Sequence, residues 1–212
     1  MNCLNKDQCI ELLDACRKEI AENVPFLCEL DSFVGDGDHG ITVSRGFDQA
    51  YSKVVDANCA NPYEVFNLFS KELGRAMGGA IGPIFQSIFL GMSNAIKDKE
   101  SIDVKDFCEM QKKALQSVMV IGGAKEGDRT LVDALAPAVR SFQGSLEAGK
   151  SFEECISEAE KAAEIGCKKT IDMIAKKGRA KFLGENSRGH QDAGATSMYY
   201  IYKAFKSYIR SK

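Results

Sequence analysis

The sequence predicts an all-α fold, an up-and-down bundle of eight antiparallel helices. Apolar side chains recur with a period of about 3.6 residues along almost the whole chain, which is the pattern of helices with one buried face. No run with a period of two residues is bounded by turn residues, so we do not expect a sheet. The 212 residues are 44% hydrophobic, which is enough to bury a sizeable core. Because no linker or repeat divides the chain, residues 1–212 are predicted to form a single domain.

Eight apolar stripes place these helices in chain order. The first four stripes run from Cys9 to Ile20, from Val43 to Val54, from Val65 to Leu73 and from Ile84 to Met92. The last four run from Phe107 to Met119, from Leu131 to Phe142, from Ile156 to Met173 and from Met198 to Ile209. The seventh pattern, residues 151 to about 177, is longer than its neighbours, and we expect it to bend near Gly166.

Helix start signals agree with several of these positions. Pro83 suits the first turn of the fourth helix, because the N–H group that proline lacks would have no helical partner there. Ser151 with Glu154, and Thr130 with Asp133, have the spacing of capping boxes.

The seven connections between the helices fall into two groups. The links after the second, fourth and sixth helices, DANCANP, KDKESID and EAGKS, are ordinary polar links. The other four links hold most of the glycine and both histidines: DSFVGDGDHGIT, GGAIGP, GGAKEGDRT and GRAKFLGENSRGHQDAGAT. Alternate connections of an up-and-down bundle lie at the same end, so these four loops should converge on one rim. Each loop leads into a helix N-terminus, whose free N–H groups attract anions, so we expect a phosphate-bearing ligand there.

Three aspartates in the first of these loops, Asp31, Asp36 and Asp38, are candidate metal ligands. Two carboxylates about 4 Å apart repel by about 1 kcal/mol in water and about 4 kcal/mol at a protein-surface dielectric, so three of them favour a bound cation. Carboxylate oxygens without a nearby thiolate favour Mg²⁺, which completes its shell with phosphates and water. A calcium-binding EF-hand is excluded, because Phe47 stands where the loop's bidentate glutamate belongs. A plain surface turn is the alternative.

Five further side chains in the glycine-rich loops have two interpretations. His39 and His190 are either loop residues bonded to the backbone or ligand contacts. Arg179 and Lys125 are either solvated charges or phosphate contacts, and the fork of the arginine suits phosphate oxygens better. Asp192 is either a helix cap or a ligand contact.

The composition argues against several classes of protein. The net charge is −2 and no run of basic residues stands out, which is unlike a nucleic-acid-binding protein. The eight cysteines include no CxxC pair and several fall on apolar helical faces, so we expect reduced cysteines in a cytoplasmic protein. The N-terminal segment lacks the apolar core of a signal peptide, and residues 76–92 are interrupted by glycines and a proline, so we expect no membrane span.

Residues 144–151, GSLEAGKS, match the pattern of a phosphate-binding P-loop. That pattern is meaningful only between a buried strand and a helix, whereas the segment before it has helical periodicity. We therefore interpret Lys150 and Ser151 as an inter-helix link and a cap. A P-loop NTPase remains the alternative that this motif would support.

Four motifs in order, GDGDHG with the preceding Asp31, GGAIGP, GGAKEGDRTLVDALAP and GRAKFLGENSRGHQDAGATS, resemble the nucleotide-binding L subunit of the dihydroxyacetone kinases. The resemblance spans nearly the whole chain and implies an eight-helix antiparallel barrel with ADP or ATP and two Mg²⁺ ions at one end. It implies that Asp31, Asp36 and Asp38 are metal ligands and, with Arg179, catalytic. It implies nucleotide contacts at His39, Gly40, Ile41, Thr42, Ala80, Ile81, Gly122, Leu131, Arg179, Asp192, Ala193 and Gly194.

The family resemblance also implies an activity. The chain would be the phosphoryl-donor subunit of a kinase whose acceptor, a short-chain ketose, is held on a separate K subunit. A phosphohistidine protein of the phosphotransferase system would recharge the bound ADP, or ATP would exchange. Several positions depart from the family pattern: Ile81 replaces a small hydroxyl residue, Thr42 replaces an asparagine and Ala193 replaces a proline. An ATP-dependent kinase for another triose or a tetrose, and a non-catalytic nucleotide-bound regulator, are the alternatives.

Overall fold

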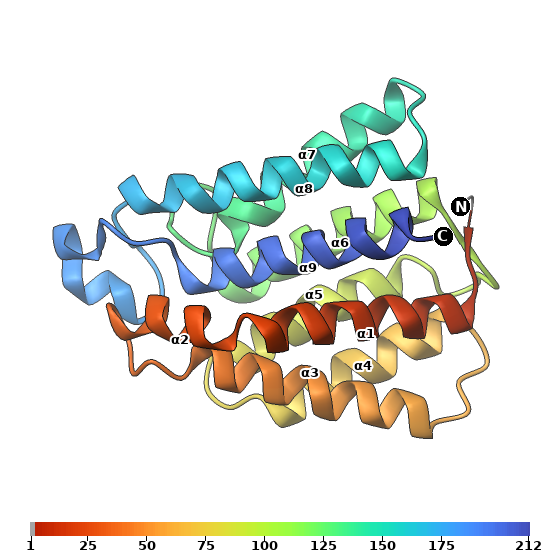
Figure 1. Cartoon of the computed structure of the whole chain (residues 1–212), viewed down its shortest axis with the longest axis horizontal. Coiled ribbons are helices and arrows are strands. Elements are labelled where there is room, and N and C mark those ends of the chain that lie inside the picture. Colours follow the sequence, from red (N-terminus) through yellow and green to blue (C-terminus); the bar gives the residue numbers. More distant parts are fainter. Residues whose placement is uncertain (1–2) are drawn as a thin grey trace.

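In the computed structural model, which describes residues 3–212, the all-α prediction is confirmed (Figure 1). The helices are α1 (Lys6–Glu22), α2 (Val24–Ser32), α3 (His39–Asp56), α4 (Pro62–Ala76), α5 (Ile81–Asn94), α6 (Val104–Gly122), α7 (Val132–Glu147), α8 (Phe152–Lys169) and α9 (Ala193–Arg210). Two 3₁₀ segments, Thr170–Asp172 and Arg179–Ser187, lie between α8 and α9. The eight predicted helices correspond to α1 and α3–α9, and α2 is an additional short helix.

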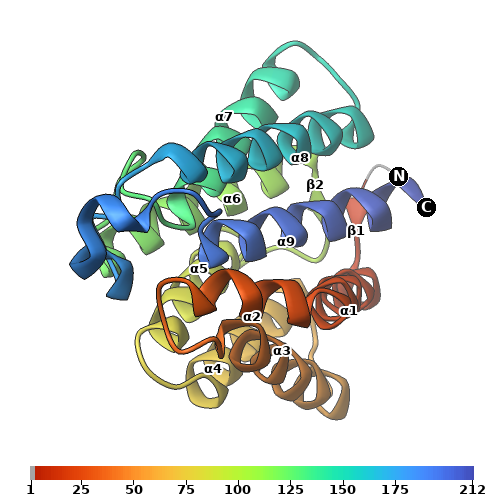
Figure 2. The ribbon, with the colours of Figure 1, turned by 60° about the vertical axis from the view of Figure 1, so that its left-hand side comes forward.

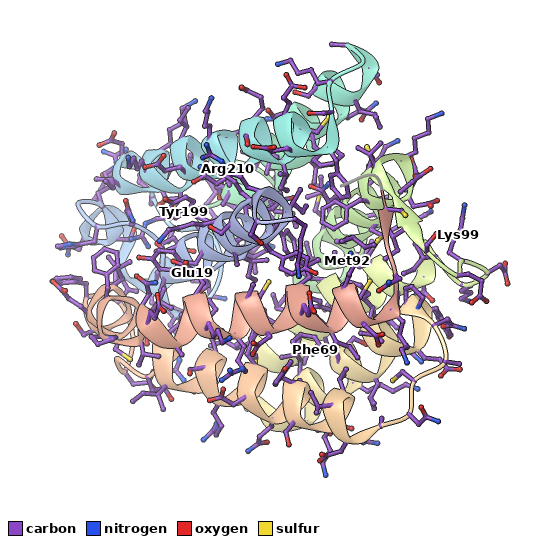
Figure 3. The ribbon with its side chains drawn as sticks, turned by 45° about the vertical axis from the view of Figure 1, so that its right-hand side comes forward. Glu19, Phe69, Met92, Lys99, Tyr199 and Arg210 are labelled. Carbon is purple, nitrogen blue, oxygen red and sulfur yellow. The ribbon has the colours of Figure 1, made fainter. Side chains whose placement is uncertain are left out.

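The eight long helices form a closed ring. α3 packs against α1, each of α4 to α9 packs against the helix before it, and α9 also packs against α1, which closes the barrel (Figure 2). Two aromatic clusters fill the interior: Phe47, Phe69, Phe85 and Phe89 on one side, and Phe107, Phe142, Phe152 and Phe205 on the other. In Figure 3, Phe69 and Met92 lie between the helices, whereas Lys99 projects from the surface. Complete burial of each phenylalanine contributes about 1.5–3 kcal/mol to folding.

The helices alternate in direction, which gives the barrel two different ends (Figure 1). The loop end carries the links 33–38, 77–80, 123–131 and 170–192 and the N-termini of α3, α5, α7 and α9. The capped end carries the links 57–61, 95–103 and 148–151 and the N-termini of α1, α4, α6 and α8. The C-terminus also lies at the capped end, where Lys212 Nζ is 2.8 Å from Glu11 Oε2 of α1.

Two predicted details of the seventh helix differ in the structure. α8 ends at Lys169 and gives way to a 3₁₀ turn, so it does not reach residue 177. Gly166 is not a bend but a helix contact, because a Cβ atom there would collide with the Asp133 carbonyl and approach Pro137 Cγ to 2.8 Å. Glycine at this position lets the α7 and α8 backbones approach closely.

The predicted start signals are present to different degrees. Ser151 and Glu154 form the complete capping box. Asp133 accepts a hydrogen bond from the Thr130 N–H at 2.7 Å, which is half of the predicted box, while α7 itself begins at Val132. The only departure from an all-helical chain in the described residues is an antiparallel pair, β1 (Cys3–Leu4) with β2 (Ile102–Asp103), too short to produce a period of two. None of the described helices combines the length and apolar character needed to cross a bilayer.

Candidate functional site

A cavity of about 460 Å³ opens at the loop end. Its walls come from all four links of that end and from the N-terminal parts of α3, α5 and α9, so the predicted convergence of the four glycine-rich loops is confirmed. The volume lies within the range of small-molecule and cofactor sites, about 300–1,000 Å³.

Three carboxylates lie together in the wall of this cavity. Each of Asp31, Asp36 and Asp38 offers one oxygen, and these three oxygens lie within 4.8 Å of one another. Oxygens around one octahedral Mg²⁺ at about 2.1 Å are roughly 3 to 4 Å apart, so the cluster needs a small closure to hold one ion, or it can share two. By donor chemistry and spacing these residues fit Mg²⁺.

The loop that carries the acids depends on two glycines for different reasons. Gly37 has a φ of +73°, a conformation that strains residues with a Cβ atom. Gly35 packs against Asp31, and a Cβ atom there would lie 2.7 Å from Asp31 Oδ1. The other oxygen, Oδ2, accepts hydrogen bonds from the N–H groups of Asp38 at 3.1 Å and His39 at 3.4 Å, which fixes the turn into α3.

Arg179 reaches the acid cluster from the far side of the cavity. It lies in the link between α8 and α9, and its guanidinium forms an ion pair with the Asp36 carboxylate. The hydrogen bond from Arg179 lowers the pKa of Asp36. Both side chains are exposed, with 69% and 52% of their surfaces accessible, so this pair contributes little to stability but places a cation beside the acids.

Three of the helix N-termini at the cavity lack a side-chain cap. The N-cap residues of α3, α5 and α7 are Asp38, Ala80 and Leu131, and in the described chain none of their side chains accepts a hydrogen bond from the helix. Asp192 does cap α9, accepting from the Ala195 N–H at 2.8 Å. The N–H of Val132, the first residue of α7, donates instead to Thr130 Oγ1 at 3.2 Å. At α3 and α5 the free first-turn N–H groups and the helix dipole together favour an anion.

Two buried titratable groups flank these N-termini. The Nε2 atom of His39 lies 2.7 Å from Ser197 Oγ on α9, and burial lowers the pKa of His39 to about 4, so its ring is neutral at pH 7. Burial raises the pKa of Asp192 to about 6. Of the two interpretations of Asp192, the cap is present, and the residue also lines the cavity.

Most of the predicted contact residues line the cavity. They are Asp31, Asp36, Asp38, His39, Thr42, Ala80, Ile81, Leu131, Arg179, Asp192, Ala193 and Gly194. Gly40 and Ile41 do not: Gly40 packs against the Val24 carbonyl of α2, and the Ile41 side chain is 57% exposed. Gly122 is also outside the lining, at the end of α6 beside Ile84.

His190 and Lys125 also lie outside the lining. The His190 ring stacks on Phe33, with centroids 3.5 Å apart and planes 5° from parallel. This stack joins the end of α2 to the α8–α9 link, so His190 supports the cavity wall from behind. The backbone N–H of Lys125 donates to Asp128 Oδ2 at 3.0 Å.

Three basic residues of the lining, Arg45, Arg129 and Lys177, were not singled out from the sequence. Lys177 and Arg129 lie in glycine-rich links, next to motifs that the sequence does mark, and that position was the available signal. Arg45 lies in the second turn of α3, where nothing in the sequence separates it from a solvated charge. Together with Arg179 they give the lining four basic side chains, which balance its four aspartates.

Comparison with known proteins agrees with this geometry. The DAK2 domain family matches residues 33–207. The chain is 34% identical over 202 residues to the "PEP-dependent dihydroxyacetone kinase, ADP-binding subunit DhaL" of Escherichia coli, covering 93% of this chain and 94% of that protein. It is 32% identical over 201 residues to the L-erythrulose kinase of Pectobacterium atrosepticum, covering 94% of this chain and 34% of that protein.

A solved structure shares the fold. The dihydroxyacetone kinase from C. freundii, crystallised in complex with AMP-PNP and Mg²⁺, matches with a TM-score of 0.69 and 24% identity, over 98% of this chain and 35% of that chain. The chain thus spans about a third of the length of this enzyme and of the L-erythrulose kinase.

Fold and relatives together define a class, the all-helical subunits and domains of kinases that act on an alcohol group. More narrowly, the chain belongs to the DAK2 domain family, because the family match covers most of its length. The resemblance read from the four motifs is thereby confirmed.

Proposed function

We propose that this chain is the nucleotide-binding, Mg²⁺-dependent phosphoryl-donor subunit of a dihydroxyacetone kinase. ADP or ATP occupies the cavity at the loop end, and residues 1–212 act as one domain, of which residues 1–2 lie outside the described part. The observation that carries the proposal is the meeting of three acids, the N-termini of α3 and α5 without N-cap side-chain bonds, and Arg179 in a single cavity. The name of the Escherichia coli relative, an ADP-binding subunit, supports it.

In this proposal each part of the cavity has one task. Asp31, Asp36 and Asp38 hold two Mg²⁺ ions, which neutralise charge on the phosphates during transfer. The free first-turn N–H groups of α3 and α5 cradle the phosphate oxygens. Arg179, whose fork matches phosphate oxygens, orients the terminal phosphoryl group and stabilises the charge that develops on it.

The remaining predicted contacts position the nucleotide. All five of the following residues line the cavity: in this proposal Thr42 and Ala80 contact the phosphates, and Leu131 with Ala193 and Gly194 offers apolar surface and backbone to the nucleoside. Gly40, Ile41 and Gly122 do not line the cavity, but each lies directly beside a lining residue in the chain or in space. Their proposed role is therefore to support those neighbours.

The acceptor is proposed to come from outside the chain. The cavity serves the phosphoryl donor, so a ketose such as dihydroxyacetone would be presented by a separate K subunit in the cytoplasm. The Escherichia coli relative is PEP-dependent, which favours recharging of bound ADP by a phosphohistidine protein of the phosphotransferase system. The L-erythrulose kinase relative favours one second candidate, an ATP-dependent kinase for a tetrose.

Reconstitution tests this proposal. The purified chain is mixed with a ketose-binding K subunit and either ATP or a phosphohistidine protein, and phosphorylation of dihydroxyacetone and L-erythrulose is measured with and without Mg²⁺. We expect Mg²⁺-dependent transfer to dihydroxyacetone, and faster transfer to L-erythrulose would replace the first candidate by the second. Failure of the chain to bind ADP or ATP in calorimetry at millimolar Mg²⁺ would refute both.

The donor is identified by a separate measurement. The chain is denatured after purification and the released nucleotide is identified by chromatography. ADP retained in stoichiometric amount indicates the phosphoprotein route, because a nucleotide that stays bound must be recharged in place. A protein that releases none but binds added ATP indicates exchange.

A further inference from the structure

Arg129 is a buried cation in the wall of the cavity. It lies in the link between α6 and α7, and its side chain is only 2% exposed although it lines the cavity. Its φ of +58° is the one positive value of a non-glycine residue in the described chain. That conformation is unfavourable for a residue with a Cβ atom and is found mostly where function or surrounding contacts require it.

Two of the three guanidinium nitrogens of Arg129 hold the link between α8 and α9. Nε donates to the Thr170 carbonyl at 3.2 Å, and Nη2 donates to the His190 carbonyl at 2.8 Å. These carbonyls lie at the two ends of the segment that carries Arg179. The side chain therefore fastens both ends of that segment to the start of α7.

The third nitrogen, Nη1, has no hydrogen-bond partner. Among the buried side-chain nitrogen and oxygen atoms of residues 3–212, it is the one so found. A buried charged donor without an acceptor is costly, so such a group is normally matched by a partner. Burial lowers the pKa of Arg129, and the carboxylate of Asp192 opposes that effect, so the side chain keeps its charge at neutral pH.

We propose that Arg129 is a ligand-binding residue of this cavity, whose Nη1 donates a hydrogen bond to an oxygen of the bound nucleotide, on a phosphate or on the ribose. The proposal rests on the proposed function, because the nucleotide is the ligand considered. The same guanidinium then joins the nucleotide to the α8–α9 link, so binding and the position of Arg179 are coupled through one side chain.

Calorimetric affinities of the Arg129→Lys and Arg129→Gln variants for ADP with Mg²⁺ test the contact. A hydrogen bond from a charged group corresponds to a loss of about 10- to 100-fold in affinity, and we expect that increase in Kd for both variants. The same measurements with AMP and with adenosine in place of ADP locate the oxygen that Nη1 contacts. A loss that disappears with adenosine places it on a phosphate, and a loss of equal size with adenosine places it on the ribose.

Arg140→Gln is the matched control. Arg140 of α7 pairs with Glu126 of the same link, with Nη1 and Nη2 at 2.7 and 2.9 Å from the two carboxylate oxygens, but it lies outside the cavity lining. Its loss removes one positive charge from the same region, so we expect its Kd for ADP to stay within about twofold of the wild-type value.

Thermal unfolding separates a contact from a purely structural role. If Arg129→Lys lowers the unfolding midpoint while its Kd for ADP remains within twofold of wild type, Arg129 only braces the loop and the inference is overturned. Because the lysine variant keeps the positive charge, it can distinguish a ligand contact from a purely structural role even if Arg129→Gln does not fold. If the wild-type chain itself binds no ADP, the proposed function fails instead.

Discussion

The two ends of the barrel treat their helix N-termini in opposite ways. At the capped end, Asn5, Asp103 and Ser151 form complete capping boxes for α1, α6 and α8, and Asn61 caps α4. At the loop end of the described chain, Asp192 caps α9, but the N-cap side chains of α3, α5 and α7 accept no hydrogen bond from their helices. Each missing N-cap bond gives up about 1 kcal/mol of stability. The difference indicates that the loop end is built to be completed by an anion.

Substitutions in the acid cluster of the loop end should have the largest effect. Substituting Asp36→Asn and Asp38→Asn together removes two charged ligands with little change of shape, so transfer in the reconstituted assay should fall by about 10²- to 10⁴-fold. The rate at saturating Mg²⁺ is the measurement. Lys150→Ala at the capped end is the control and should change the rate by less than twofold. The reverse pattern would mean that GSLEAGKS is the nucleotide site after all.

His39 should give the loop end a pH-dependent stability. Its pKa of about 4 in the folded chain lies below the ordinary value of 6.5, so the unfolded chain takes up the proton first as the pH falls. This contribution to stability is complete above pH 6.5 and is lost between pH 6.5 and 4, by at most about 3 kcal/mol. Urea unfolding across that range should show the loss in wild type and a smaller one in His39→Gln.

Asp192 supplies the control for this titration. Its pKa of about 6 in the folded chain is above the ordinary value of 3.8, so between pH 6 and 4 the folded chain takes up that proton first and gains stability. Asp192→Asn removes the opposing effect, and the variant should therefore lose stability more steeply than wild type as the pH falls. A shallower curve would contradict both assignments.

A matched pair of glycines, one at each end of the barrel, allows a comparison of the two ends with a smaller expected effect. Gly37 at the loop end and Gly149 at the capped end have nearly equal φ values, +73° and +75°. Alanine at either position should lower the free energy of unfolding by about 1–2 kcal/mol, because the left-handed conformation strains a residue with a Cβ atom. Only Gly37→Ala should also weaken Mg²⁺-dependent ADP binding, as measured by calorimetry. Equal loss of binding in both variants would show that the effect is global.

The smallest effect is expected from a single cap. Ser151→Ala removes the hydrogen bond from the Glu154 N–H to the Ser151 hydroxyl and should cost about 1 kcal/mol in chemical unfolding. Its affinity for ADP should equal that of wild type, because the cap lies at the far end of the barrel. An altered affinity would imply that the two ends are coupled through the core.

The sequence predicted the helices that bury long stripes and missed the one that does not. α2 has nine residues, begins beside Pro25 and buries only Leu27 and Leu30, so no stripe marks it. Gly166 was taken for a bend, because the pattern of one helix does not show how closely another helix packs against it.

The loops of the candidate site could be predicted to a similar extent. The three acids could be identified because three negative charges fall close together in the sequence. Glycine content and alternating helix direction predicted that their loop and the other three glycine-rich loops lie at the same end of the barrel. Arg129 was not singled out, although it lies in the motif GGAKEGDRT, because an arginine in a polar link has the composition of a solvated residue. Its importance comes from burial and from partners 41 and 61 positions away.

The position of the C-terminus beside the start of α1 has a practical consequence for measurement. An affinity tag or a tether attached at Lys212 emerges from the face farthest from the cavity, near Glu11. If the chain is immobilised in this way on a biosensor chip, the cavity at the loop end of every molecule would face the flowing solution. A large second protein could then be tested for docking on the nucleotide-loaded rim without obstruction by the surface.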